Sequence, residues 1–237
     1  MRHVEQVMGT AVSIDLDDPS LLAGVCAWLH EVDARFSTYK QDSEVNRFQR
    51  KEIAFEDLSA DMRHVLDACA ELWRETDGYF DAYAAGPLDP SGYVKGWSVE
   101  VASARLASAG STRHYINAGG DIRVRGGPWR IGVRHPWEAD KTSWVLSVTD
   151  GAVATSGTYE RGEHVWNPRT REPARGLRSV TVTGPDLARA DALATAGLAM
   201  GEAGIAWLAD RIAEGYESAV VTDDGRAFTS PGLPLKA

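Results

Sequence analysis

The hydrophobic periodicity of this chain changes near Tyr115. Before that point, apolar residues recur at helical spacing in long stretches, whereas after it most apolar residues fall in short alternating runs. Helical patterns in one part of a chain and strand patterns in another favour an α+β fold over an alternating fold with a parallel sheet. Because no internal repeat or linker is visible, the 237 residues are expected to form one domain, residues 1–237.

Caps and periodicity predict the individual elements. Helices are predicted from Asp18-Pro19 to about Phe36, from Ser59 to Asp77, from the 86–97 loop to about Gly110, from Leu187 to Met200 and from Ile205 to Ile212. Predicted strands cover 122–125, 129–133, 144–148 and 178–183, with a closing hairpin at 220–229.

Turn signals among the predicted strands are less definite. Residues 4–15 are strand-like but interrupted at Met8-Gly9-Thr10, which fits a bulge, an edge irregularity or a close approach of the backbone to a ligand. Gly126-Gly127 is a hairpin turn signal before the run 129–133. Residues 36–46 read as a polar loop that carries one aromatic side chain, Tyr39.

Composition excludes several classes of function. A net charge of −9 without any Lys/Arg run argues against a nucleic-acid groove. No apolar run reaches the length needed to span a membrane, and the segment 1–6 has no apolar signal-peptide core. The sequence therefore predicts a cytoplasmic enzyme or binding protein.

Cysteine and histidine spacing gives no zinc motif. The two cysteines, Cys26 and Cys69, fall on apolar stripes of predicted helices and read as reduced core residues. We set His3 aside as terminal, and His30 and His64 as structural or solvated. Since no HExxH, HxH or paired Cys/His spacing occurs, a zinc site is not predicted. Ser156 lacks the GxSxG context of a serine hydrolase.

Asp191 and Thr195 lie four residues apart in a helix-prone run of small residues. Both side chains therefore fall on one helix face, where a carboxylate and a hydroxyl are suitable ligands for Mg²⁺. The same spacing also fits Asp191 as an acid in the first turn of a helix and Thr195 as a packed helix residue. This segment alone leaves both interpretations open.

A second stretch, 86–97, combines turn residues with polar groups. Gly92 and Gly96 leave backbone accessible, Asp89 supplies an acceptor and Lys95 a cation, and a helix begins here. Anionic ligands favour a helix N-terminus with a nearby lysine. Neither a Walker A loop nor a GxGxxG fingerprint is present, so this stretch taken alone favours a structural loop over a phosphate site.

Taken in order, the motifs of this chain resemble those of the FAD:protein FMN transferase (ApbE) family. They span about four-fifths of the sequence and are modest singly, but their order is specific. They are Met8-Gly9-Thr10, Phe36-Ser37-Thr38-Tyr39 with Ser43-Glu44, Gly78-Tyr79-Phe80-Asp81, the run from Asp89 to Trp97, Asn117-Ala118-Gly119-Gly120-Asp121-Ile122, Ala154-Thr155-Ser156-Gly157, the run from His164 to Thr170, and the run from Asp191 to Thr195.

The resemblance implies a fold and an activity. The implied fold is T-fold-like α+β, with mixed or antiparallel sheets flanked by helices and two lobes around a flavin-binding cleft. The implied activity is Mg²⁺-dependent transfer of the FMN part of FAD to a Ser or Thr hydroxyl of a target flavoprotein, within an Asp-Gly-x-Ser/Thr-x-Ala-Thr pattern, with release of AMP. A Mg²⁺-dependent FAD pyrophosphatase and a non-catalytic FAD-binding protein are the alternatives.

The resemblance also implies roles for particular residues. Mg²⁺ is expected on Asp191, Thr195 and the carbonyl of Gly92. General-base candidates for the acceptor hydroxyl are His164, whose ordinary pKa suits the task, and Asp191 through an oxygen not engaged by the metal. Contacts to FAD are expected from Met8, Thr38, Tyr39, Tyr79, Phe80, Asp81, Asp89, Lys95 and Val165.

Two features depart from the family pattern. Pro90-Ser91-Gly92 stands where the family usually has a small residue followed by Gly-Ala, which makes the carbonyl ligand an inference. The connection from Ala82 to Leu88 is shorter than usual, so part of the flavin or acceptor surface is expected to differ.

Overall fold

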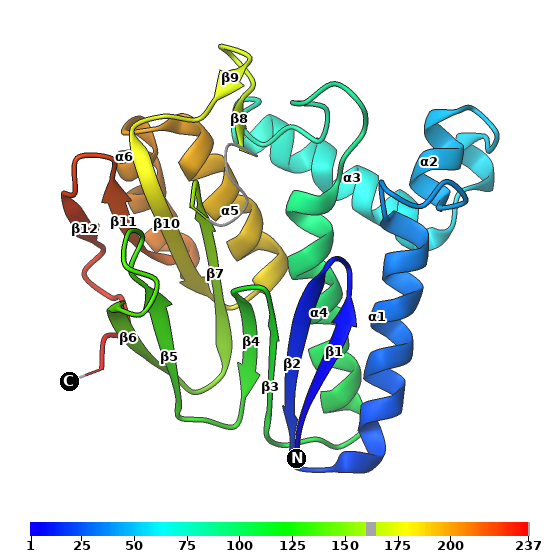
Figure 1. Cartoon of the computed structure of the whole chain (residues 1–237), viewed down its shortest axis with the longest axis horizontal. Helices are drawn as coiled ribbons and strands as arrows, with labels where there is room; N and C mark the ends of the chain where they lie inside the picture. The colour runs from blue at the N-terminus through cyan, green and yellow to red at the C-terminus, as the bar shows by residue number, and fades with distance from the viewer. Residues whose placement is uncertain (160–164, 237) are drawn as a thin grey trace.

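An eight-stranded antiparallel sheet organises the protein (Figure 1). The computed structural model describes residues 1–159 and 165–236. The strand order is β1-β2-β3-β4-β7-β10-β11-β12, and every neighbouring pair is antiparallel. The bounds are β1 (Arg2–Val7), β2 (Thr10–Leu16), β3 (His114–Ala118), β4 (Asp121–Arg125), β7 (Gly151–Gly157), β10 (Leu177–Gly184), β11 (Glu217–Thr222) and β12 (Ala227–Thr229).

Two small antiparallel pairs and six α-helices complete the described structure. The pairs are β5 (Trp129–Arg134) with β6 (Thr142–Val148), and β8 (Trp166–Asn167) with β9 (Glu172–Pro173). The helices are α1 (Leu22–Phe36), α2 (Glu44–Gln49), α3 (Ala60–Glu75), α4 (Ser91–Ser108), α5 (Leu187–Met200) and α6 (Ala203–Ala209), with 3₁₀ turns at Pro19–Leu21, Phe55–Asp57 and Asp210–Glu214. This mixed fold with a large antiparallel sheet confirms the predicted α+β class.

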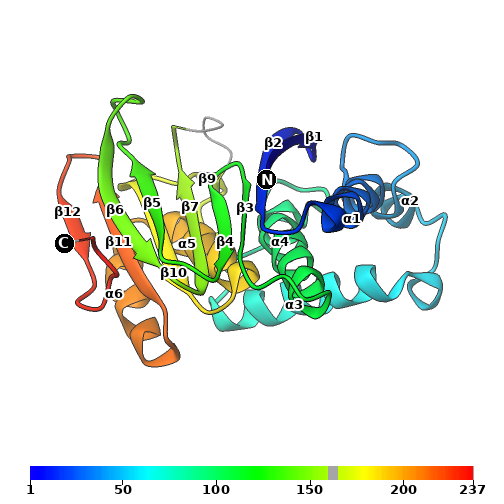
Figure 2. The same ribbon diagram turned by 90° about the horizontal axis from the view of Figure 1, so that it is seen from below.

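The two faces of the sheet are covered differently (Figure 2). On one face α4 packs against β3 and β4, and α5 packs against β7 and β10, while α1 and α3 contact α4 from outside. On the other face Ile122 and Val124 of β4 pack with Ile131 of β5 and Leu146 of β6 in a separate apolar cluster. β4 is therefore buried on both faces.

Helix α5 is the most deeply buried helix element, and its composition explains why. Alanine and glycine dominate its sequence, so neighbouring backbones can approach it from several sides. Asp186 caps its first turn by accepting a hydrogen bond from the Arg189 N–H at 2.8 Å, and Gly201, at φ 64°, ends it. The predicted bounds, Leu187 to Met200, agree with the structure.

Local turn predictions were less successful. Met8 and Gly9, at φ 54° and 67°, form a two-residue turn that joins β1 to β2, so interpreting this site as a bulge or edge irregularity was wrong. Gly126-Gly127 does not close a hairpin, because β4 pairs with β3 and β7 whereas β5 pairs with β6. The loop predicted at 36–46 ends early, since Ser43 caps α2.

None of the helices in the described ranges combines the length and apolar character needed to cross a bilayer.

Candidate active site

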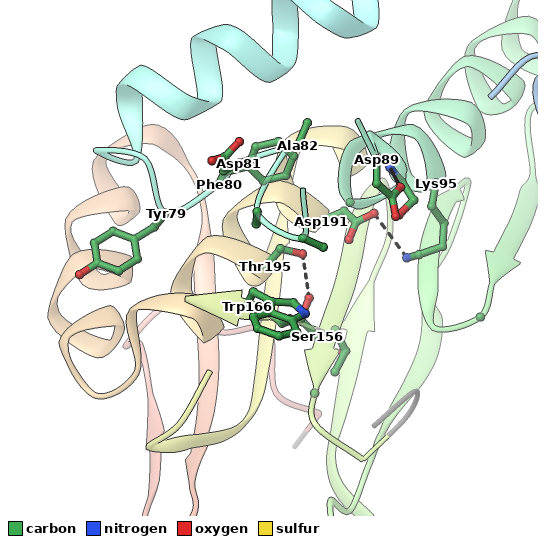
Figure 3. Close-up of a pocket in the computed structure, with 18 residues that line it drawn as sticks. Tyr79, Phe80, Asp81, Ala82, Asp89, Lys95, Ser156, Trp166, Asp191 and Thr195 are labelled. Atoms are coloured by element: carbon green, nitrogen blue, oxygen red, sulfur yellow. Dashed lines mark hydrogen bonds and ion pairs between the residues drawn. The ribbon is translucent and has the colours of Figure 1, made fainter. Parts of the chain in front are cut away.

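A cavity opens beside the sheet where α4, α5 and β7 meet (Figure 3). The space between these elements amounts to about 990 Å³ and includes open solvent, so the cavity is a cleft at the surface and not an enclosed chamber. Its lining comes from segments that lie far apart in the sequence: Tyr79, Phe80, Asp81, Ala82, Ala84, Ala85, Asp89, Ser91, Gly92, Lys95, Gly119, Thr155, Ser156, Gly157, Val165, Trp166, Asp191 and Thr195.

We call Lys95, Ser156, Asp191 and Thr195, with Asp121 behind Lys95, the floor of this cavity. The rim is the turn 79–85 with Asp89 and Trp166. Figure 3 shows Lys95 directed toward Asp191 and Thr195 directed toward Ser156, while Tyr79 lies at the far end of the rim.

Asp191 and Thr195 both line the cavity from α5, as their spacing predicts. Asp191 is only 3% exposed, and its Oδ2 accepts a hydrogen bond from the Gly96 N–H at 3.1 Å. Thr195 Oγ1 lies 3.2 Å from Ser156 Oγ. Interpreting Asp191 as a first-turn acid is wrong, because α5 begins at Leu187 and has no acidic residue in its first turn.

Gly96 lets α4 approach α5 closely enough for the hydrogen bond to Asp191. A Cβ added at Gly96 would lie 2.7 Å from the Leu187 carbonyl oxygen and 2.9 Å from Asp191 Cβ. Both distances are below normal contact, and the first involves backbone. A larger residue at position 96 would therefore separate the two helices that carry Lys95 and Asp191.

Lys95 lies between two buried carboxylates. Its Nζ is 3.4 Å from Asp191 Oδ2 and also forms an ion pair with Asp121. Asp121 is fully buried. Its Oδ2 pairs with Lys95, while its Oδ1 has no hydrogen-bond partner within the described residues. The charge of Lys95 is thus what compensates the carboxylate of Asp121.

Asp121 was absent from the predicted site residues. Gly119 and Gly120, at φ 59° and 102°, form the two-residue turn between β3 and β4, and Asn117 Oδ1 accepts the Gly120 N–H at 2.8 Å. This turn places Asp121 first on β4, next to α4. The adjoining glycines were the available signal, because they mark a tight hairpin followed by a carboxylate.

A second ionic network, centred on Arg123 and Glu100, connects the elements that carry the floor residues. The buried Arg123 on β4 donates to Glu100 Oε1 at 3.0 Å and to Asp150 Oδ1 at 2.7 Å. Glu100 Oε2 accepts the Leu187 N–H at 2.8 Å, at the first residue of α5. The carboxylate of Glu100 therefore links α4, β4 and the start of α5.

The rim is built from short-range hydrogen bonds. The buried hydroxyl of Thr76 accepts the Phe80 N–H at 2.8 Å. Asp81 Oδ1 accepts the Tyr83 N–H at 2.8 Å, and Asp89 Oδ1 accepts the Ser91 N–H at 3.0 Å. Asp81 and Asp89 thus stabilise turns as well as facing the cavity.

Two aromatic groups border the cavity on opposite sides. Phe80 is buried, and a Cβ added at Gly92 would lie 3.4 Å from its ring. The absence of a side chain at Gly92 therefore lets α4 lie close to the Phe80 ring. Trp166 of β8 is half-buried and lines the same cavity as Ser156 (Figure 3). The sequence analysis did not single out Trp166. Val165, which the resemblance implies as a contact to FAD, also lines the cavity, and its role in FAD binding stays a prediction.

Several predicted site residues are not brought together with these groups. In the part of the chain that the structure describes, Met8, Thr38 and Tyr39 do not line the cavity. The Met8 sulfur instead accepts from the Ser98 hydroxyl at 3.7 Å, and Tyr39 is 96% exposed. Their roles in flavin binding stay predictions. His164 lies outside the described residues.

The charges of the cavity suit a bound divalent cation. Among the described lining residues, Asp81, Asp89 and Asp191 carry negative charge and Lys95 alone carries positive charge. Lys95 is already paired with carboxylates, so a phosphate ligand would meet net negative charge. Asp191, Thr195 and Gly92 all line the cavity, and a carboxylate, a hydroxyl and a backbone carbonyl are hard oxygen donors of the kind that fits Mg²⁺.

A comparison with family models matches residues 8–87 and 84–219 to the ApbE family. The chain belongs to the ApbE family.

Similar ApbE-family proteins include two named FAD:protein FMN transferase. One, from Rhodobacter capsulatus, is 36% identical over 159 residues, which is 62% of this chain and 30% of that protein. Another, from Vibrio cholerae, is 27% identical over 252 residues, which is 78% of this chain and 75% of that protein. This chain thus aligns with less than a third of the length of the Rhodobacter protein.

Solved ApbE structures share the fold. The ApbE protein from Thermotoga maritima superposes with a TM-score of 0.87 at 22% identity, covering 98% of this chain and 97% of the other. The flavin transferase ApbE from Vibrio cholerae gives a TM-score of 0.84 at 24% identity, with the same coverage. The cavity lining from Asp89 to Thr195 falls inside the second family match.

Proposed function

We propose that this chain is a Mg²⁺-dependent flavin transferase that moves the FMN part of FAD to a Ser or Thr hydroxyl of a target flavoprotein and releases AMP. The observation that carries the proposal is the meeting of Asp191, Thr195 and Gly92 with Lys95 in one cavity. In this proposal, the cavity is the flavin cleft between two lobes of a T-fold-like arrangement.

Asp191, Thr195 and the Gly92 carbonyl would hold the cation. When bound, Mg²⁺ supplies positive charge that offsets the pyrophosphate oxygens. Lys95 adds a fixed positive charge at the same wall, held in place by Asp121. Trp166 offers a planar surface for a flavin or adenine ring.

The proposed reaction is a phosphoryl substitution. The acceptor hydroxyl oxygen forms a bond to the FMN phosphorus, the bond from that phosphorus to the bridging oxygen breaks, and the bridging oxygen leaves with AMP. The hydroxyl proton passes to a base, for which His164 and Asp191 are the candidates. If His164→Ala keeps full turnover with FAD bound, His164 is not that base.

Mass spectrometry of the purified protein with FAD, Mg²⁺ and an Asp-Gly-x-Ser/Thr-x-Ala-Thr peptide tests the proposal. We expect the peptide to gain one FMN with matching AMP, and Asp191→Ala to lower the rate by at least about 100-fold. Asp186→Asn on the same helix is the matched control, because asparagine caps a helix as well as aspartate.

The outcomes separate the alternatives. FMN and AMP with an unmodified peptide would indicate an FAD pyrophosphatase, with water in place of the acceptor. The short connection between Ala82 and Asp89, closed by the Asp89 N–H to Ala82 oxygen hydrogen bond at 2.7 Å, favours this as the second candidate because it leaves the rim small. Bound FAD without turnover would contradict both activities.

A further inference from the structure

Four side chains with metal-ligating atoms gather between β1 and α1, at the edge of the sheet and away from the cavity. His3 and Glu5 are two residues apart on β1 and therefore share a face of the strand. Cys26 and His30 are four residues apart on α1 and share a face of the helix. Both views show β1 beside α1 (Figures 1 and 2).

The carboxylate of Glu5 is the centre of this cluster. Its Oε2 is 2.8 Å from His3 Nε2, and its Oε1 is 2.7 Å from His30 Nε2. The Cys26 thiol also hydrogen-bonds to it. The ligand atoms of His3, Glu5 and Cys26 all lie within 4.8 Å of one another.

The donor set suits a borderline-soft transition metal. An imidazole nitrogen, a thiolate and a carboxylate are the three ligand types that Zn²⁺ uses in proteins. Zn–N and Zn–S bonds of about 2.0–2.3 Å in a tetrahedron put ligand atoms roughly 3.3–3.8 Å apart. Side-chain rotation therefore suffices to close the three ligands around one ion.

The cluster is also accessible to an ion from solvent. The side chains of His3 and Glu5 are 32% and 22% exposed, and that of His30 is 53% exposed. Cys69, by contrast, is buried in α3. Without a cation, burial beside Glu5 raises the pKa of the Cys26 thiol to about 11, so a metal would have to displace its proton.

We propose that His3, Glu5 and Cys26 form a binding site for a divalent transition metal of the Zn²⁺ type, with His30 orienting the Glu5 carboxylate through a hydrogen bond. Water would complete the coordination. The site would clamp the edge strand β1 to α1, since two ligands come from one element and one from the other. It uses no residue of the proposed flavin site.

Co²⁺ and Zn²⁺ titrations of the metal-free full chain test this site. We expect one equivalent of Co²⁺ to give a thiolate-to-cobalt charge-transfer band in the wild type and in Cys69→Ser, and no such band in Cys26→Ser. Competition with a chromophoric chelator should show Zn²⁺ affinity at least about 10-fold weaker in Cys26→Ser and in His3→Ala, and a smaller loss in His30→Ala. Zn²⁺ should raise the Tm of the wild type and not that of Cys26→Ser.

Three results would overturn the proposal. The first is a cobalt band that survives in Cys26→Ser and disappears in Cys69→Ser. The second is a wild type that binds neither metal at micromolar concentration, in which case the four side chains form a hydrogen-bonded network without a metal. Asp191→Ala should keep the cobalt band. The third result is loss of the band in Asp191→Ala. It would mean that the site depends on the flavin cavity, which no cysteine among the described residues lines, and it would contradict a separate metal site independently of the transfer assay.

Discussion

The floor of the cavity rests on long buried elements, whereas the rim is made of turns. Lys95 and Asp191 come from α4 and α5, and Asp121 from a strand buried on both faces. Asp81 and Asp89, by contrast, accept hydrogen bonds from backbone two residues further along the chain. Floor positions therefore depend on tertiary packing, and rim positions on local geometry.

This difference has an energetic consequence. Substitutions in the floor should change stability and activity together, because the same contacts hold the helices and place the polar groups. Substitutions of the rim residues that are not buried, such as Asp81, Asp89 and Trp166, should change ligand affinity with little cost in folding.

Removing the charge of Lys95 should have the largest effect on stability. Lys95→Met leaves the buried carboxylate of Asp121 uncompensated, and we expect a loss of about 3 kcal/mol in the free energy of unfolding, measured by urea denaturation. Lys141→Met is the control, since Lys141 pairs with Glu138 where both side chains are well exposed and should cost within about 0.5 kcal/mol.

A double variant sharpens that result. Lys95→Met with Asp121→Asn removes both charges, so part of the stability lost in Lys95→Met should return. Equal losses in the single and double variants would mean that the ion pair is not the cause.

Gly96→Ala should have the next largest effect. The added methyl group would meet the Leu187 carbonyl oxygen at 2.7 Å, and forcing the helices apart should cost about 1–3 kcal/mol. Gly24→Ala is the control in α1, because a Cβ there meets nothing within 4 Å and should stabilise by about 0.5–1 kcal/mol. Thermal unfolding of both variants measures the difference, and a stabilised Gly96→Ala would contradict the close approach.

Trp166→Ala tests the rim. Loss of a stacking surface should weaken FAD binding by about 10-fold, measured by flavin fluorescence, with Tm unchanged within about 2 °C. A strongly destabilised Trp166→Ala would instead mean that Trp166, like the floor residues, contributes to the stability of the fold through tertiary packing.

Tyr39→Ala should have the smallest effect. The ring is 96% exposed and does not line the cavity, so FAD affinity should stay within about 2-fold of the wild type. A loss comparable to that of Trp166→Ala would restore the role predicted from the sequence and would require the segment 37–42 to move onto the ligand.

The elements of the floor were largely predictable from the sequence. The bounds of α5 and the shared face of Asp191 and Thr195 follow from caps and from helical spacing, which are local properties. Asp121 was missed because its partner Lys95 lies on α4, far away in the sequence. The pairing of β5 with β6 in place of β4 was missed for a similar reason, since alternation predicts a strand but not its neighbour.

The metal-ligating cluster shows the same limit. The pairs His3/Glu5 and Cys26/His30 each lie on one face of one element, yet neither is a zinc motif by itself. Only the packing of α1 against β1 brings the pairs together.

One face of β4 carries charged side chains and the other carries apolar side chains. This difference constrains the length of the turn that precedes the strand. Asp121 and Arg123 face α4 with their charges, while Ile122 and Val124 face the β5–β6 layer. Adding or deleting one residue in the Gly119-Gly120 turn would shift the register of β4 by one residue and so move each of its side chains to the other face of the sheet. The guanidinium of Arg123 would then enter the apolar cluster, and Lys95 would lose its partner Asp121. We therefore expect length changes to be tolerated in the 82–88 connection and rejected in this turn, which a library of single-codon insertions would reveal.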